Sequence, residues 1–177
     1  MLQRFVKKIV PGIVMGCTAL VLSGCVDRPL NRLGLSAGDE IPAFYLKDAV
    51  SGKSVGSDDL KGKPYVISIF GTWCPPCRME LNEFQKKLWE PLQDSGIGVY
   101  GINFGDEDEA TIKDFAKANG ITFPLLVDVE ASFRHQAGVS AVPQSYVVGK
   151  DGRILETHEG FSSESVDAIK SELLKAK

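Results

Sequence analysis

The sequence contains few residues that bind metals or build a network of disulfides. Of its 177 residues, only four are cysteine and two are histidine. Cys74 and Cys77 form one close pair, but there is no second pair, and His135 and His158 lie far along the chain. A structural zinc site requires four ligands, so this composition disfavours a zinc-binding domain. It equally disfavours a small domain held together by several disulfides.

Positive charge is also scarce, and the formal net charge is −3. The first 24 residues carry three positive charges and no negative ones, so the rest of the chain has 17 Lys and Arg against 23 Asp and Glu, a net charge of −6. An acidic domain lacks the basic surface that binds phosphates, so we expect no nucleic-acid partner. There is no internal repeat, and the length and 44% hydrophobic content fit one globular domain.

The N-terminal segment has the pattern of a secretion signal. Arg4, Lys7 and Lys8 precede an uncharged stretch over residues 9–26. The stretch contains Leu-Ser-Gly-Cys ending at Cys25, which resembles the lipobox of bacterial lipoproteins and implies cleavage before Cys25 and lipid attachment to its sulfur. An uncleaved membrane anchor is the alternative, because the uncharged run is close to the shortest span of a transmembrane helix.

Both alternatives place the domain outside the cytoplasmic membrane and attached to it. Residues 25–37 are rich in glycine, proline and polar side chains, which is typical of a short tether. We therefore expect a lipoprotein signal peptide over residues 1–24, a lipidated cysteine and tether over residues 25–37, and a folded domain over residues 38–177.

A strand, a turn and a helix are expected around the cysteine pair. Residues 64–70 are β-rich and nearly all apolar, which predicts a strand covered on both faces. Pro75 suits the first turn of a helix, so Cys74 should lie at the helix N-terminus, where the dipole and unpaired N–H groups favour the nucleophilic thiolate. Cys77, one turn later, would resolve a mixed disulfide. An inert pair or a structural disulfide is the alternative, but so short a loop makes a poor staple.

The remaining pattern alternates strands and helices. We expect an N-terminal hairpin with its turn at Ser51-Gly52 and a later hairpin with its turn at Asp151-Gly152. Pro91 should kink or end the first helix near Trp89. The other expected strands span residues 97–104, 123–127, 146–148 and 154–157. We also expect a helix led by the acidic residues 106–109 and stopped at Asn119-Gly120, a short helix over residues 130–136, and a last helix capped by Ser162 or Ser163. This order predicts an α/β three-layer sandwich with a mixed central sheet.

These features together resemble the thioredoxin fold, and more narrowly the TlpA/ResA-like membrane-tethered oxidoreductases. The resemblance is carried by the N-terminal hairpin, by Gly71-Thr-Trp-Cys74, by the extra strand and helix that follow, and by Val142-Pro143 before a hairpin. It implies that Pro143 is a cis-proline beside a redox-active disulfide of Cys74 and Cys77. We expect substrate contacts from Trp73, Pro75, Pro76 and Val142, the alternative for Trp73 being simple packing under the loop.

Two positions depart from related patterns. Plain thioredoxins bury an acid in the central strand six residues before the first cysteine, and Ser68 stands there instead. ResA-like members carry an acid after the next strand, in a Gly-acid step that Gly105-Asp106 matches. Asp106 is therefore the expected proton acceptor for Cys77, the alternative being a solvated acid that caps a helix. Gln144 replaces the threonine that often follows the cis-proline, so substrate preference can differ.

The expected activity is thiol–disulfide exchange without a cofactor, in the direction of a protein-disulfide reductase. The resemblance implies a membrane thiol transporter as electron donor and a disulfide-containing exported protein as substrate, for example an apocytochrome c. Three alternatives stay open: a disulfide donor with the same residues, a peroxiredoxin-like peroxidase, and a metal carrier. Gly71 stands where the peroxidase would have threonine, and no His or Met near the cysteines supports metal binding.

Overall fold

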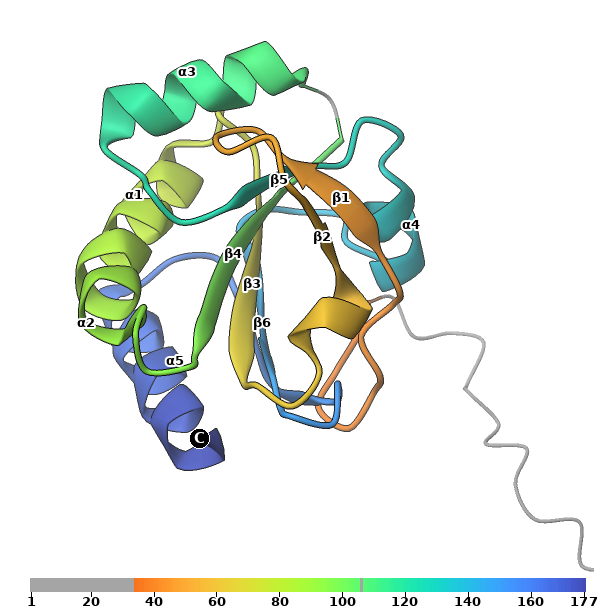
Figure 1. Ribbon diagram of the computed structural model, residues 1–177, viewed down its shortest axis with the longest axis vertical. Helices are drawn as coiled ribbons and strands as arrows, with labels where there is room; N and C mark the ends of the chain where they lie inside the picture. The colour runs from red at the N-terminus through yellow and green to blue at the C-terminus, as the bar shows by residue number, and fades with distance from the viewer. Residues whose placement is uncertain (1–33, 106) are drawn as a thin grey trace, which may run out of the picture. The chain divides into compact units, whose positions relative to one another are not determined.

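One mixed β-sheet crosses the part of the chain that the computed structural model describes, residues 34–105 and 107–177 (Figure 1). Its seven strands follow the order β2-β1-β5-β4-β3-β6-β7. The expected signal peptide, most of the tether, Cys25 and Asp106 lie outside the described residues. The structure therefore leaves the expectations about them as predictions.

The central strand is β3 (Tyr65–Phe70), and all six of its residues are buried. It pairs in parallel with β4 (Gly98–Asn103) on one side and antiparallel with β6 (Gln144–Val148) on the other. Beyond β4, the parallel strand β5 (Leu125–Val127) continues the sheet. The apolar run before the cysteines thus forms the strand expected from it, covered on both faces.

Hairpins form both edges of the sheet. At one edge β1 (Tyr45–Asp48) and β2 (Ser54–Gly56) pair antiparallel, and β1 also pairs with β5. At the other edge β6 pairs antiparallel with β7 (Ile154–Glu159). These are the two hairpins that the turn residues predict, and the mixed sheet confirms the expected α/β fold class.

The helices follow the expected order. α1 (Pro75–Phe84) starts at the cysteines, and α3 (Glu109–Asn119) is capped by Asp108 and stopped by Gly120, whose positive φ of 65° suits glycine. α4 (Ser132–Ala137) follows β5, and α5 (Ser163–Ala176) begins after the N-cap Ser162. A 3-10 turn, η1 (Ser57–Leu60), precedes β3.

The first helix extends further than Pro91 predicts. After α1 comes a π-helical turn, η2 (Gln85–Trp89), and then α2 (Glu90–Leu92). The N–H of Glu90 bonds to the carbonyl of Gln85, and that of Gln93 bonds to Trp89. The wider turn accommodates the missing N–H of Pro91, so the helix is irregular near Trp89, as expected, but ends three residues later.

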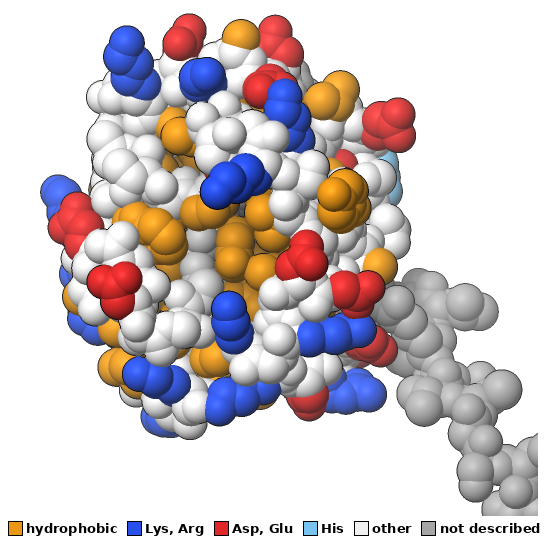
Figure 2. All heavy atoms as spheres, viewed as in Figure 1, with side chains coloured by type: hydrophobic (Ala, Val, Ile, Leu, Met, Phe, Trp, Pro, Cys, Tyr) orange, Lys and Arg blue, Asp and Glu red, His pale blue; other side chains and the backbone are white. Residues whose placement is uncertain are grey.

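Two groups of buried side chains cover the two faces of the sheet, which makes three layers. Val66 and Phe70 of β3 belong to the group that includes α1, α3 and α5, whereas Tyr65, Ile67 and Ile69 belong to the group that includes α4 and η1. This split follows the alternation of side chains along a strand. On the face seen in Figure 2, acidic and basic side chains are interspersed around grouped hydrophobic ones.

Candidate active site

The two cysteines are joined by a disulfide at the end of the central strand, where α1 begins. Cys74 is the N-cap of α1, and the backbone N–H of Cys77 donates a hydrogen bond to its Sγ at 3.2 Å. The N–H of Cys74 bonds to the carbonyl of Gly71, which closes the turn after β3. Cys74 is 4% exposed and Cys77 is fully buried. An incoming sulfur atom can therefore reach only Cys74.

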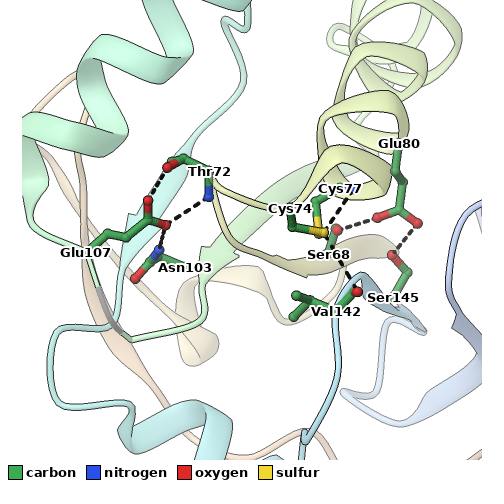
Figure 3. The surroundings of a disulfide bond; sticks show 9 residues. All are labelled: Ser68, Thr72, Cys74, Cys77, Glu80, Asn103, Glu107, Val142 and Ser145. Atoms are coloured by element: carbon green, nitrogen blue, oxygen red, sulfur yellow. Dashed lines mark hydrogen bonds between the residues drawn. A yellow bond between two sulfur atoms is a disulfide. The ribbon is translucent and has the colours of Figure 1, made fainter.

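The loop before β6 lies against this disulfide. The Val142–Pro143 peptide bond is cis, and the carbonyl oxygen of Val142 lies 3.8 Å from Cys74 Sγ (Figure 3). A hollow of about 390 Å³ is lined by this loop and by Thr157 and Glu159 of β7. The fold thus brings Val142 and Pro143 to the cysteine pair across 68 residues of sequence.

Exposed side chains surround the almost fully buried disulfide. Trp73 is 54% exposed, Pro75 and Pro76 are exposed at the start of α1, and Met79 is 56% exposed one turn later. Three of the expected substrate-contact residues, Trp73, Pro75 and Pro76, therefore lie on the surface around Cys74.

A buried carboxylate that the sequence analysis did not select lies next to the cysteines. Glu80 of α1 is fully buried and accepts hydrogen bonds from the hydroxyls of Ser68 at 2.5 Å and Ser145 at 3.1 Å (Figure 3). Ser68 and Ser145 face each other across β3 and β6. Burial raises the pKa of Glu80 to about 7, although both hydroxyls act in the opposite direction.

The position of Glu80 explains the serine in the central strand. Where plain thioredoxins have an acid on the strand, this chain has Ser68, which holds an acid supplied by the helix. The signal was in the sequence, because Glu80 lies three residues after Cys77, on the stripe of Leu81, Phe84 and Leu88 that faces the core. An acidic residue at helical spacing from core-facing apolar residues is expected to be buried with them, as Glu80 is.

A second carboxylate reaches the turn before Cys74 from the loop that precedes α3. Glu107 accepts hydrogen bonds from the backbone N–H of Thr72 at 2.9 Å, from the Thr72 hydroxyl, and from Asn103 Nδ2 at 2.8 Å (Figure 3). Sequence analysis selected the preceding residue, Asp106, which lies outside the described residues. Only the tertiary structure shows that Glu107 contacts the active-site turn.

Two features are absent from the described residues, 34–105 and 107–177. No group of three or more His, Cys, Asp and Glu residues is arranged to hold a metal ion there. His135 is exposed on α4, and His158 is on the edge strand β7. Within the same residues, no helix has the length and apolar character needed to cross a membrane.

Comparisons with known proteins agree with this geometry. Residues 37–157 match the AhpC/TSA family. The chain is 30% identical over 143 residues to the thiol-disulfide oxidoreductase ResA of Bacillus thuringiensis (strain Al Hakam), covering 77% of this chain and 81% of the relative. ResA of Bacillus subtilis (strain 168) is 28% identical, with 77% and 74% covered.

Solved structures are also similar in fold. A thiol:disulfide interchange protein of the thioredoxin family from Chlorobium tepidum TLS superposes with a TM-score of 0.64 at 28% identity, covering 76% of this chain and 95% of the other. The family match over residues 37–157 includes the cysteine pair, the cis-proline loop and the buried carboxylate.

Proposed function

The chain belongs to the AhpC/TSA family and, within it, to the thiol-disulfide oxidoreductases of the ResA type, and from this premise we propose that it is a membrane-tethered reductase of disulfides in exported proteins. Its enzymatic class, thiol-disulfide oxidoreductase, follows from its relatives and its thioredoxin fold. The observation that carries the proposal is a reversible-type Cys-x-x-Cys disulfide at a helix N-terminus, with one sulfur slightly accessible and the other buried.

The reaction starts from the dithiol form. The Cys74 thiolate attacks one sulfur of the substrate disulfide, a mixed disulfide forms, and the other substrate sulfur leaves as a thiolate. Cys77 then loses its proton and attacks Cys74 Sγ, which breaks the mixed disulfide. The Cys74–Cys77 disulfide forms, and two electrons and two protons reduce the substrate to a dithiol. The position of Cys74 as N-cap supports its role, since helix N-terminal N–H groups stabilise a thiolate.

Glu80 is our candidate for the group that accepts the proton of Cys77. It follows Cys77 by one helical turn on the same buried side of α1, and its pKa of about 7 allows it to bind and release a proton near neutral pH. Asp106 remains the other candidate, proposed from the sequence. Glu80 is supported by its hydrogen bonds to Ser68 and Ser145, which fix its carboxylate against β3 and β6.

Substrate binding is assigned to the surface around Cys74. In this proposal Pro143 and the backbone of Val142 contact an extended substrate segment, and Trp73, Pro75 and Pro76 contact its surroundings. The hollow beside the Val142–Pro143 loop offers space for such a segment. Gln144 also lines this hollow, and its side chain carries an amide where threonine would carry a hydroxyl.

The peroxidase alternative lacks room for its threonine. A Cβ atom at Gly71 would lie 2.6 Å from the ring of Trp73, so a side chain there would displace that ring. This steric argument favours disulfide exchange over peroxide reduction.

The sequence supports the location and the partners. Lipid on Cys25 and a tether over residues 25–37 would hold the domain on the outer side of the cytoplasmic membrane, where a reductase needs electrons from a membrane thiol transporter. Exported proteins with oxidised cysteines, such as an apocytochrome c, are the substrate class. ResA-type relatives are thiol-disulfide oxidoreductases by name, which agrees with this class of reaction.

The direction of the reaction is tested by the reduction potential of the full-length protein in detergent, equilibrated against a thiol buffer. A potential near or below about −250 mV supports a reductase, whereas about −120 mV identifies a disulfide donor. Cys77→Ser should accumulate a mixed disulfide with a protein substrate through Cys74, and Cys74→Ser should not. If neither variant traps a substrate and no two-electron couple is seen, the proposed function is wrong.

A further inference from the structure

The carboxylate of Glu107 links three parts of the chain at the active-site end of the sheet. Its Oε2 accepts from the Thr72 N–H at 2.9 Å and from Asn103 Nδ2 at 2.8 Å, and its Oε1 accepts from the Thr72 hydroxyl. We call these three residues the Glu107 clamp. Thr72 lies in the turn between β3 and α1, Asn103 ends β4, and Glu107 precedes α3. The clamp therefore connects the turn before Cys74 to the neighbouring strand.

The strand side of the clamp is fixed. Asn103 is fully buried, and its Oδ1 accepts a hydrogen bond from the N–H of Gly105 at 2.8 Å. With both ends of its amide bonded, Asn103 holds the Glu107 carboxylate in one orientation. The N–H of Phe104 also bonds to the carbonyl of Phe70 at 2.8 Å, which joins the ends of the two strands. Thr72 is thus bonded to a rigid part of the sheet.

Trp73 follows Thr72 directly, so its placement depends on the backbone that the clamp holds. Its ring is 54% exposed, lies edge-on to Phe104 with 6.1 Å between ring centroids, and covers Gly71. The guanidinium of Arg134 packs over the same Phe104 ring at 4.2 Å. Trp73 can therefore keep its contact with Phe104 beside Cys74 only if the turn between β3 and α1 stays in one position.

We propose that Glu107 is a positioning residue that holds Thr72 and thereby fixes Trp73 on the surface that a protein substrate contacts. The proposal rests on the proposed function, since it concerns recognition of a protein disulfide. Glu107 hydrogen-bonds to Thr72 and Asn103, whereas Cys74 is held by the helix and the disulfide. Its loss should therefore weaken binding of a protein substrate much more than it changes sulfur chemistry.

Glutamine and alanine at position 107 separate hydrogen bonding from charge. The amide oxygen of glutamine can accept from the Thr72 N–H and Asn103, and its NH₂ can donate to the Thr72 hydroxyl. Glu107→Gln thus keeps the three hydrogen bonds without the charge, and Glu107→Ala removes all of them. Thr72→Val removes only the hydroxyl bond. Glu130→Gln, in the exposed loop after β5, is the matched control for loss of a negative charge.

The experiment uses the full-length protein in detergent and two reactions. Single-turnover oxidation of the reduced enzyme by insulin disulfides gives a half-saturation concentration and a limiting rate. Reduction of the Cys74–Cys77 disulfide by dithiothreitol reports sulfur chemistry alone. Glu107→Ala should raise the half-saturation concentration about fivefold or more, with the limiting rate and the dithiothreitol rate within about twofold of wild type. Glu107→Gln and Glu130→Gln should stay within about twofold throughout.

A double-mutant comparison and a fluorescence measurement complete the test. Thr72→Val should have a smaller effect than Glu107→Ala and none in the Glu107→Ala background, because both act through one set of bonds. In a Trp89→Phe background, Trp73 is the remaining tryptophan. Its emission should change in Glu107→Ala and not in Glu107→Gln. The fluorescence measurement needs no substrate. It therefore tests whether Glu107 fixes Trp73 even if the wild type does not reduce insulin and the proposed function is wrong.

Three results would overturn the clamp. Unchanged Trp73 emission in Glu107→Ala would show that the turn does not depend on Glu107. A parallel fall of the insulin and dithiothreitol rates would place its effect on the sulfurs or on folding. Equal damage from glutamine and alanine would assign the effect to charge instead of hydrogen bonding.

Discussion

Replacement of Glu80 by glutamine should make the protein more stable at pH 8 than the wild type, by an amount that depends on pH. The ordinary pKa of this carboxyl is 4.5, and burial raises it to about 7 in the folded protein. Between these values the folded protein keeps a proton that the unfolded chain has released. The free energy of unfolding of the wild type therefore falls as pH rises through this window, and the stabilising contribution of the protonated carboxyl is complete only below pH 4.5.

The magnitude follows from the difference between the two pKa values. One pKa unit corresponds to about 1.4 kcal/mol, so ionisation of Glu80 should cost about 3 kcal/mol across the whole window. Glutamine stays neutral, and its amide can accept from one serine hydroxyl while donating to the other, Ser68 or Ser145. The difference in stability between Glu80→Gln and wild type should therefore grow by about 3 kcal/mol from pH 4.5 to pH 8.

Urea unfolding of the oxidised protein at several pH values between 4.5 and 8 measures this difference. Other titrating groups are common to both proteins and cancel in the comparison. Glu130→Gln, which removes an exposed acid, should give a difference that is nearly constant with pH. A constant difference for Glu80→Gln, within about 0.5 kcal/mol, would refute the reasoning, because it would mean that Glu80 titrates alike in the folded and unfolded chains.

Three other changes test separate parts of the structure. Ser68→Ala removes a hydroxyl that donates to Glu80 and should raise the pKa of the Glu80 carboxyl further. Infrared titration of the carboxyl measures this pKa, and a fall would contradict the hydrogen bond from Ser68 to the carboxylate. Gly105→Ala would place a Cβ atom 2.4 Å from the Cβ of Ala131, at a backbone φ of 98°. Gly120→Ala has open space around its Cβ and should lower the free energy of unfolding by about 1–2 kcal/mol through backbone strain alone. In urea unfolding, Gly105→Ala should therefore destabilise the protein more than Gly120→Ala. Equal losses would contradict the packing. Cys25→Ser should move the protein from the membrane fraction to the soluble fraction, whereas retention would support an uncleaved anchor.

The elements could be predicted because local chemistry determines them. The apolar run that became β3, the cap at Ser162 and the stop at Gly120 each depend on a few neighbouring residues. The first helix is irregular near Trp89, as Pro91 predicts, but the sequence did not show that a π-helical turn would let it continue to Leu92. No pattern of apolar residues reports such a change of helical geometry.

The part of the site that depends on residues close together in the sequence was also predicted. Cys74 and Cys77 are neighbours in sequence, and the resemblance to a known family gave Pro143. Glu80 was missed because the search looked for an acid on the strand, at position 68, and not for a helix residue that reaches the same place. Glu107 was missed because its contact with Thr72 spans 35 residues and depends on how two strand ends meet.

Burial of the sulfur atoms also has a kinetic consequence. With Cys77 fully covered and Cys74 only 4% exposed, small thiols and oxidants dissolved around the domain collide with the reactive bond far less often than with a surface disulfide. On the proposed function, exchange should therefore be fast only when a docked protein brings a sulfur atom to Cys74. The oxidation state of Cys74 and Cys77 would then depend on the concentrations of reduced and oxidised partner proteins, and exchange with small thiols in solution would be slow.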